Sequence, residues 1–134
     1  MREMADYLLD THACVYSLAA PAKLGNAARR ALEAVEAGRS IAWIPAAVAA
    51  EIALLRERDR IGVGLPQLRT ALEQTPGLQF LALDFPQIEM FATLTAIKDP
   101  FDRLIVSACR ITGARLITRD GNLLDSKVLM TLWD

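Results

Sequence analysis

The chain has 134 residues, about the length of one domain on the usual prior of roughly 100–200 residues, and 53% of them are apolar, which argues against disorder. Its 15 basic and 16 acidic side chains give a net charge of −1, which argues against coating nucleic acid through bulk positive charge. A single histidine excludes a metal site built from several, and the distant Cys14 and Cys109 form neither a metal-binding spacing nor a disulfide framework.

Apolar runs and breaker residues predict alternating strands and helices along the whole chain. In the first half these are a strand over 7–9, a helical turn over 13–18, a helix over 26–37, a strand over 41–44 and a helix from Pro45 through Leu55. In the second half they are a helix over 67–74, a strand over 78–83, helices over 86–97 and 100–112, and strands over 115–118 and 128–132. This alternation predicts one α/β domain over 1–134, with a mostly parallel twisted sheet flanked by helices on both faces.

No targeting or membrane segment is expected. Two acids, Glu3 and Asp6, precede any apolar run, which a signal peptide would not carry. The longest weakly charged stretch, 40–55, is shorter than the roughly 20 residues that span a bilayer. We therefore expect a cytoplasmic protein, in keeping with the sparse cysteines.

Two aspartates directly follow predicted strands. Asp10 ends the strand at 7–9, and Asp120 follows the strand at 115–118. Ligands of open α/β sheets sit at the carboxyl ends of strands, so parallel strands place both acids at a functional edge. The alternatives are a plain helix cap for Asp10 and a turn over 118–122 for Asp120.

Three further acids stand out. Glu51 is the one charge between Arg39 and Arg56, inside an apolar helix, where a carboxylate is costly unless it is paired, binds a metal or reaches solvent. Asp99-Pro100-Phe101-Asp102 is typical of a helix start, with an N-cap, a proline at N1 and an acid at N3. Capping alone explains both aspartates, yet it also places two ionised carboxylates together. Gathered in one place, such acids repel one another unless a cation is present, and oxygen ligands select Mg²⁺ or Mn²⁺ over zinc.

At these residues the chain resembles the PIN-domain ribonucleases, and most closely the VapC-type toxins of bacterial toxin–antitoxin modules. The resemblance spans essentially the whole chain in order. It is carried by the segments at 8–13 (LLDTHA), 50–52 (AEI), 99–105 (DPFDRLI) and 116–120 (LITRD), and by the closing Leu132-Trp133.

The resemblance implies a PIN-like fold and Mg²⁺- or Mn²⁺-dependent hydrolysis of RNA phosphodiester bonds by a metal-activated water. It also implies a small antitoxin partner and a homodimer. Carried over by position, the catalytic acids are Asp10, Glu51, Asp102 and Asp120. The metal ligands are Asp10, Asp102, Asp120 and Asp99. Groups that orient these acids or contact substrate are Thr11, Thr118, Arg103, Arg119 and Asn122.

The two arginines beside candidate acids have two interpretations. The planar guanidinium forks of Arg103 and Arg119 suit phosphate recognition, but an ion pair with the neighbouring acids explains them equally. His12, two residues from Asp10, has three interpretations: a group that supports the acids, a general acid, or the structural role that a lone histidine more often has. We expect Trp43 and Phe101 to belong to the core.

Two rival functions remain at this point. A phospho-receiver domain is also a small parallel α/β fold with acids and Mg²⁺ at strand ends, but the first strand here ends in one acid, and Lys127 is poorly placed. A PIN-like module that binds without catalysis is the other rival. Metal-dependent RNA cleavage distinguishes it from the ribonuclease.

Overall fold

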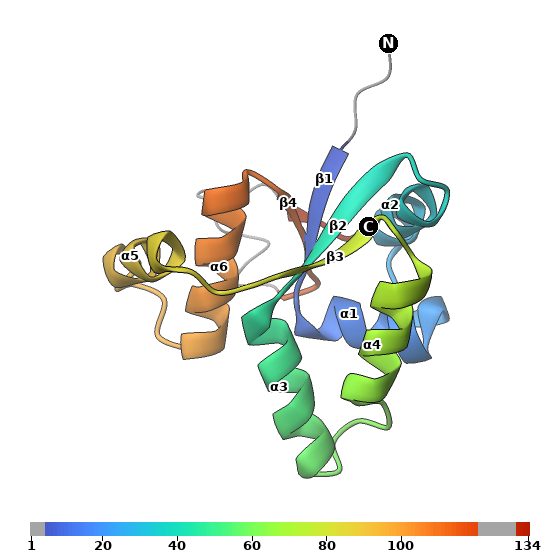
Figure 1. Cartoon of the computed structure of the whole chain (residues 1–134), viewed down its shortest axis with the longest axis horizontal. Helices are drawn as coiled ribbons and strands as arrows, with labels where there is room; N and C mark the ends of the chain where they lie inside the picture. Colours follow the sequence, from blue (N-terminus) through green and yellow to red (C-terminus); the bar gives the residue numbers. More distant parts are fainter. Residues whose placement is uncertain (1–4, 121–130) are drawn as a thin grey trace.

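Within residues 5–120 and 131–134, which the computed structural model describes, five parallel strands form one sheet (Figure 1). The strands are β1 (Ala5–Leu9), β2 (Ser40–Pro45), β3 (Leu78–Leu81), β4 (Arg115–Ile117) and β5 (Thr131–Leu132). The predicted strand over 128–132 is described only at its last two residues. Asn122 and Lys127 lie outside the described residues.

Six α-helices and one short 3-10 helix join the strands over the same ranges. They are α1 (Thr11–Ala19), η1 (Pro21–Lys23), α2 (Asn26–Glu36), α3 (Ala46–Glu57), α4 (Leu65–Gln74), α5 (Phe85–Thr93) and α6 (Pro100–Thr112). In Figure 1, α5 and α6 lie on one side of the sheet, and α1, α2 and α4 lie on the other. The predicted α/β fold with a parallel sheet between helices is confirmed. No described helix is long and apolar enough to cross a membrane.

Some predicted boundaries were wrong at helix ends. α1 begins at Thr11 rather than at residue 13, because Asp10 caps it. Pro45 is the last residue of β2 and the N-cap of α3 rather than part of its first turn. α5 ends at Thr93 rather than at residue 97, because the N–H of Leu94 turns back to the carbonyl of Phe91.

The strand order β3-β2-β1-β4-β5 determines where a ligand can bind. The chain first moves from β1 outward through β2 to β3, and then returns to the other side of β1 to form β4 and β5. In such sheets the crevice lies outside the carboxyl ends of the strands at the point of reversal, which here falls between β1 and β4. The receiver-type order, 2-1-3-4-5, is different, so the phospho-receiver alternative is excluded.

The core lies on both faces of the central strands. Leu8 and Leu9 of β1, Ile44 of β2, and Leu116 and Ile117 of β4 are all fully buried. Burial on both faces explains why these strands are runs of apolar residues rather than alternating patterns. The central strands therefore hold the end of β1 rigidly beside the end of β4.

Four other residues that the sequence singled out are also inside or against this core. The free thiols of Cys14 and Cys109 are buried, and burial raises the pKa of each to about 12. Trp43 and Phe101 are partly buried and pack against the core, as predicted.

Candidate active site

The carboxylate of Asp10 lies where β1 ends and α1 begins, beside the reversal of the strand order. Asp10 is only 7% exposed. Its Oδ1 accepts a hydrogen bond from the N–H of Ala13 at 2.8 Å and so caps α1, while its Oδ2 accepts one from the hydroxyl of Thr118. Burial raises the pKa of Asp10, against the lowering effect of these two hydrogen bonds. A carboxylate has about four lone-pair positions, so the cap does not use up its capacity.

Thr118 connects the acids that follow the two adjacent strands. Its side chain is fully buried. The hydroxyl donates to Asp10 Oδ2 and accepts a hydrogen bond from the N–H of Asp120 at 3.0 Å. One threonine thus positions the carboxylate after β1 and the backbone of the acid after β4.

A second threonine holds Glu51. The hydroxyl of Thr11, at the first position of α1, donates to Glu51 Oε1 at 2.5 Å. Glu51 projects from α3 and is partly buried, while Thr11 is 3% exposed. The Glu51 carboxylate, which is unusual in an apolar helix, is therefore hydrogen-bonded to Thr11 of α1.

The start of α6 follows the pattern of its sequence. Asp99 is the N-cap, and its Oδ1 accepts a hydrogen bond from the N–H of Asp102 at 3.0 Å. Pro100 occupies the first helical position and Gly113 ends the helix with φ of +71°. The predicted capping is confirmed, and it leaves the Asp102 carboxylate in the first turn.

One cavity of about 340 Å³ gathers these groups. It is lined by Asp10, Thr11, His12, Glu51, Asp99, Asp102, Ile105, Arg119 and Asp120. All five candidate acids are among these residues. Burial, followed by the charges of Asp99, Asp120, Glu51 and Asp10, raises the pKa of Asp102 to about 6.

This cavity fits a hard, hydrated cation better than a closed metal cage. Its potential ligands are almost all carboxylate oxygens, and their mutual repulsion is what a bound cation relieves. Among the described residues, no group of three or more His, Cys, Asp or Glu side chains is already arranged so that it could hold a metal ion. Mg²⁺ usually keeps several waters and takes one or two carboxylates, so the open, oxygen-lined cavity suits it.

The two candidate arginines have different surroundings. Arg119 lines the cavity, and its guanidinium carbon lies 5.0 Å from the centroid of the Tyr16 ring. Arg103 is not among the lining residues. Its Nε donates to the carbonyl of Ile97 at 2.8 Å, and its guanidinium carbon lies 4.7 Å from the centroid of the Phe91 ring. Of the two, only Arg119 is placed to meet a molecule in the cavity.

Sequence reasoning missed Tyr16, which lies beside the acids. His12, for which a structural and a site role were both open, is exposed and lines the cavity. Its ring centroid lies 6.2 Å from that of Tyr16, one turn further along α1. The i, i+4 spacing of His12 and Tyr16 after the strand-ending Asp10 was the available signal.

Comparisons with known proteins agree with this architecture. The chain matches the family described as PIN domain over residues 7–128. It is 31% identical over 127 residues to Ribonuclease VapC22 of Mycobacterium tuberculosis, covering 90% of this chain and 91% of that protein.

Solved structures show the same fold at low identity. VapBC2 from Rickettsia felis, bound to a DNA fragment from its promoter, has a TM-score of 0.70 at 20% identity, covering 96% of this chain and 99% of the other. FitAcB from Neisseria gonorrhoeae has a TM-score of 0.65 at 18% identity, covering 94% and 96%. A toxin–antitoxin complex from Klebsiella pneumoniae has a TM-score of 0.61 at 17% identity, covering 94% and 95%. The chain belongs to the PIN-domain family and is distantly related to the VapC ribonuclease toxins.

Proposed function

We propose that this protein is a Mg²⁺- or Mn²⁺-dependent endoribonuclease and the toxin of a type II toxin–antitoxin system. The observation that carries the proposal is the cavity at the strand reversal, in which five carboxylates from four separate parts of the chain converge. The relatives support the chemistry, since one is named a ribonuclease and another is a toxin–antitoxin complex.

In this proposal, Asp10, Asp99, Asp102 and Asp120 hold the metal. A bound Mg²⁺ or Mn²⁺ supplies an activated water and stabilises the charge that develops on the phosphate. Two threonines of the chain hold the acids in position. Thr118 orients Asp10 through its hydroxyl, and Thr11 orients Glu51.

Glu51 acts on the attacking water, and Arg119 helps to bind the RNA. Glu51 Oε1 accepts the Thr11 hydroxyl, which leaves its second oxygen to accept a proton from the attacking water. Arg119 lines the same cavity and offers a planar set of donors to a phosphate of the RNA backbone. The Asp102 carboxylate, whose pKa is raised to about 6, accepts the metal more readily as the pH rises above that value.

The test is cleavage of several single-stranded RNAs with Mg²⁺ and with Mn²⁺. We expect wild type to cleave, and Asp10→Asn and Asp102→Asn to lose activity while staying folded. Asp84→Asn is the matched control, because Asp84 caps α5 by accepting from the N–H of Gln87 and is not among the residues that line the cavity. Undiminished cleavage by both site variants would contradict the assignment. No cleavage by wild type with either metal would favour the module that binds without catalysis.

The toxin role has its own test. The protein partners we propose are a small antitoxin and a second copy of the chain, and the compartment is the cytoplasm. An apolar groove of about 420 Å³, lined by residues of α3, α4 and β3 that include Leu65, Leu72 and Phe80, offers a surface for a protein partner. Expression should arrest growth, and co-expression of the adjacent gene product should relieve the arrest. Growth that continues normally would contradict the toxin role and leave the ribonuclease test unaffected.

A further inference from the structure

A cluster of aromatic and cationic side chains lies at the edge of the acidic cavity, on the helix that Asp10 caps. At its centre is Tyr16 of α1, which is partly buried. The guanidinium carbon of Arg119 lies 5.0 Å from the centroid of the Tyr16 ring, and Lys23 Nζ lies 5.6 Å from it. Both distances are within the range of cation–π attraction. One ring therefore holds two cations that come from different elements.

Two other rings lie near the Tyr16 ring. His12 lies 6.2 Å away by ring centroids and Trp133 lies 6.3 Å away, both tilted. Trp133 is anchored because its carbonyl accepts a hydrogen bond from the N–H of Ala28 at 2.9 Å. The geometry of Tyr16 is therefore fixed by α1 and by the C-terminal segment together.

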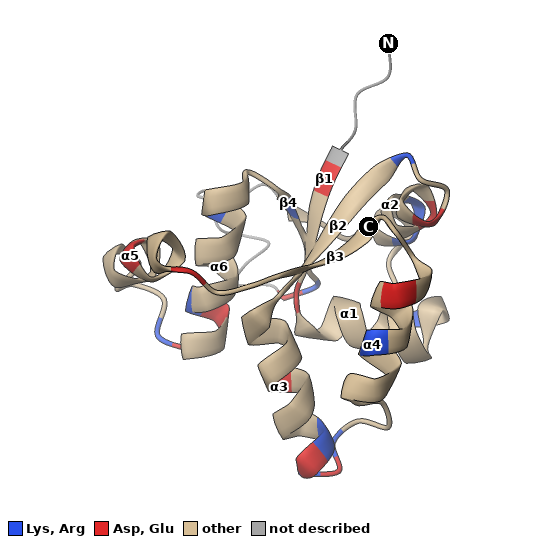
Figure 2. Ribbon diagram, viewed as in Figure 1, with Lys and Arg blue, Asp and Glu red and all other residues tan. Residues whose placement is uncertain are grey.

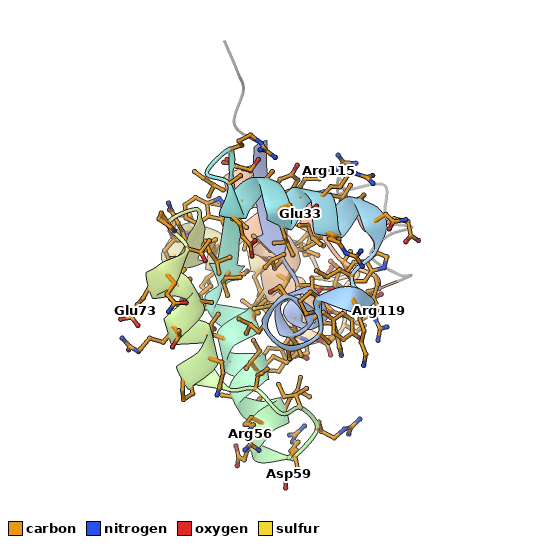
Figure 3. The ribbon with its side chains drawn as sticks, turned by 90° about the vertical axis from the view of Figure 1, so that its right-hand side faces the viewer. Glu33, Arg56, Asp59, Glu73, Arg115 and Arg119 are labelled. Atoms are coloured by element: carbon orange, nitrogen blue, oxygen red, sulfur yellow. The ribbon has the colours of Figure 1, made fainter. Side chains whose placement is uncertain are left out.

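The two cations are open to solvent although they are held in place. Arg119 and Lys23 are both exposed, and Figure 3 shows Arg119 at the surface beside the N-terminal, blue part of the ribbon. Stacking on an aromatic ring restrains a guanidinium without using up its planar fork of donors. Arg103 makes the contrasting contact, because its stacking on Phe91 is combined with a hydrogen bond from Nε to the Ile97 carbonyl.

Arg119 and Lys23 are cations beside a cavity that is lined mainly by acids. The cavity is lined by five acids, and Figure 2 shows red and blue segments on both sides of the sheet rather than one basic face. A polyanion that enters the cavity needs cations next to it, since phosphate contacts dominate the affinity of nucleic-acid binding. A cavity of about 340 Å³ is at the small end of ligand pockets, so it suits one strand rather than a duplex.

We infer that Tyr16 is a positioning residue that holds Arg119 and Lys23 as a two-cation phosphate subsite, along which a single RNA strand leaves the acidic cavity over α1 and η1. This inference rests on the proposed ribonuclease function. Arg119 takes the phosphate nearest the cavity, and Lys23 takes a phosphate further along the strand. The subsite thereby gives a protein of net charge −1 a defined path for RNA.

The test is binding of a labelled single-stranded RNA by fluorescence anisotropy, in Mg²⁺, on an Asp102→Asn background so that the RNA is not cut. The slope of log K against log salt is negative, and each lost phosphate contact should reduce its magnitude by about 0.7 for single strands. We expect this change for Arg119→Gln and for Lys23→Gln. Arg115→Gln is the matched control, because Arg115 is exposed at the opposite end of β4, well apart from Arg119 in Figure 3. It should leave the slope unchanged.

The role of Tyr16 is tested by substitutions that keep or remove its aromatic ring. Tyr16→Phe keeps the aromatic face and should bind as the background does, whereas Tyr16→Leu should weaken binding several-fold. Adding Tyr16→Leu to the pair Arg119→Gln and Lys23→Gln should have no further effect, because the ring acts through these cations. Thermal melts establish that each variant is folded.

The outcomes separate this inference from the ribonuclease proposal. Unchanged salt slopes for both cation variants would overturn the subsite, as would equal weakening by Tyr16→Phe and Tyr16→Leu. In proteins that keep Asp102, Arg119→Gln should raise KM for RNA several-fold more than it lowers kcat. If wild type cleaves no RNA, the ribonuclease proposal fails, while the anisotropy ranking still decides the subsite.

Discussion

The hydroxyl of Thr118 makes two hydrogen bonds, and its methyl group is buried with it. It donates to Asp10 and accepts from the N–H of Asp120, and it is fully buried. Valine has nearly the same shape but offers neither bond. Serine keeps both and loses a buried methyl group.

Thr118→Val should therefore lower the free energy of unfolding by about 1–3 kcal/mol, because a buried carboxylate oxygen and a backbone N–H lose their partner. If the proposed site is correct, RNA cleavage should also fall by about 10–100-fold, as is typical when a group that orients a metal ligand is removed. Thr118→Ser should retain most of the activity. Denaturant unfolding and initial cleavage rates measure the two effects, and equal activity in Val and Ser variants would contradict the orienting role.

Asp102 illustrates how the acid cluster opposes folding when no metal is bound. Its pKa is raised to about 6 by burial and by the four neighbouring acids, above the ordinary value of 3.8. Between these two values the folded chain binds more protons than the unfolded chain. Stability from this group is therefore fully present below about 3.8 and is lost as the pH rises through about 6.

Asp102→Asn should consequently raise the melting temperature of the protein in EDTA at pH 7.5, although it removes a proposed metal ligand. The gain over wild type should shrink as the pH falls from 7 toward 4, because wild-type Asp102 then becomes protonated in the folded state. Thermal melts across this pH range test the linkage. A gain that does not depend on pH would show that the charge of Asp102 is not its cause.

At the residue scale, local sequence patterns singled out the individual acids as site candidates. They did not predict which residues would lie beside those acids in space. Asp10, Glu51 and Asp102 each stood out against the residues beside them. The contacts of Tyr16 with Arg119 and Trp133 join residues more than 100 positions apart. No local pattern contains such pairings, because they depend on how β4 and the C-terminal segment return to α1.

At the scale of the element, the N-terminus of α6 combines a cap and a candidate metal ligand in Asp99. Asparagine caps a helix about as well as aspartate, whereas alanine does not cap. Substitution can therefore separate the two roles. α5 supplies a second aspartate cap, Asp84, whose Oδ1 accepts from Gln87 at 3.1 Å.

Asp99→Asn should leave the melting temperature in EDTA near the wild-type value, or raise it, and yet reduce metal-dependent RNA cleavage. Asp99→Ala should also cost about 1 kcal/mol of stability through the lost cap. The same pair of substitutions at Asp84 should reproduce the stability effects without the loss of activity. If Asp99→Asn cleaves RNA as wild type does, Asp99 is only a cap.

The elements that carried explicit end signals were predicted best. The helix over 100–112 has the predicted bounds, because Asp99-Pro100 begins it and Gly113 adopts the left-handed conformation after it. The start of α1 was predicted two residues late, because Asp10 ends one element and caps the next. The environment of Gly25 could not be predicted from the local sequence. A Cβ there would lie 2.3 Å from the carbonyl oxygen of Trp133, a close approach that depends on tertiary structure.

At the scale of the whole molecule, the strand order and the charge distribution meet at one place. The reversal between β1 and β4 brings Asp10 and Asp120 to the same edge, and α3 and α6 add their acids from outside the sheet. The fold thus gathers like charges where parallel sheets bind ligands. Repulsion among these acids lowers the free energy of unfolding of the metal-free protein. Any cation that binds there relieves the repulsion and stabilises the fold.

Mg²⁺ should therefore raise the free energy of unfolding of wild type in proportion to ln(1 + [Mg²⁺]/Kd), by about 2.7 kcal/mol at 100 times Kd. The melting temperature should rise with it. For a domain of this size that corresponds to a shift of roughly 5–22 °C, at about 2–8 °C for each kcal/mol. Asp10→Asn should lose most of the shift, because it removes the most buried of the five carboxylates that line the cavity, and Asp84→Asn should keep it. Sodium chloride at matched ionic strength controls for screening, which acts on all surface charges alike. An equal Mg²⁺ shift in wild type and Asp10→Asn would place the cation elsewhere on the molecule and remove the main support for the proposed site.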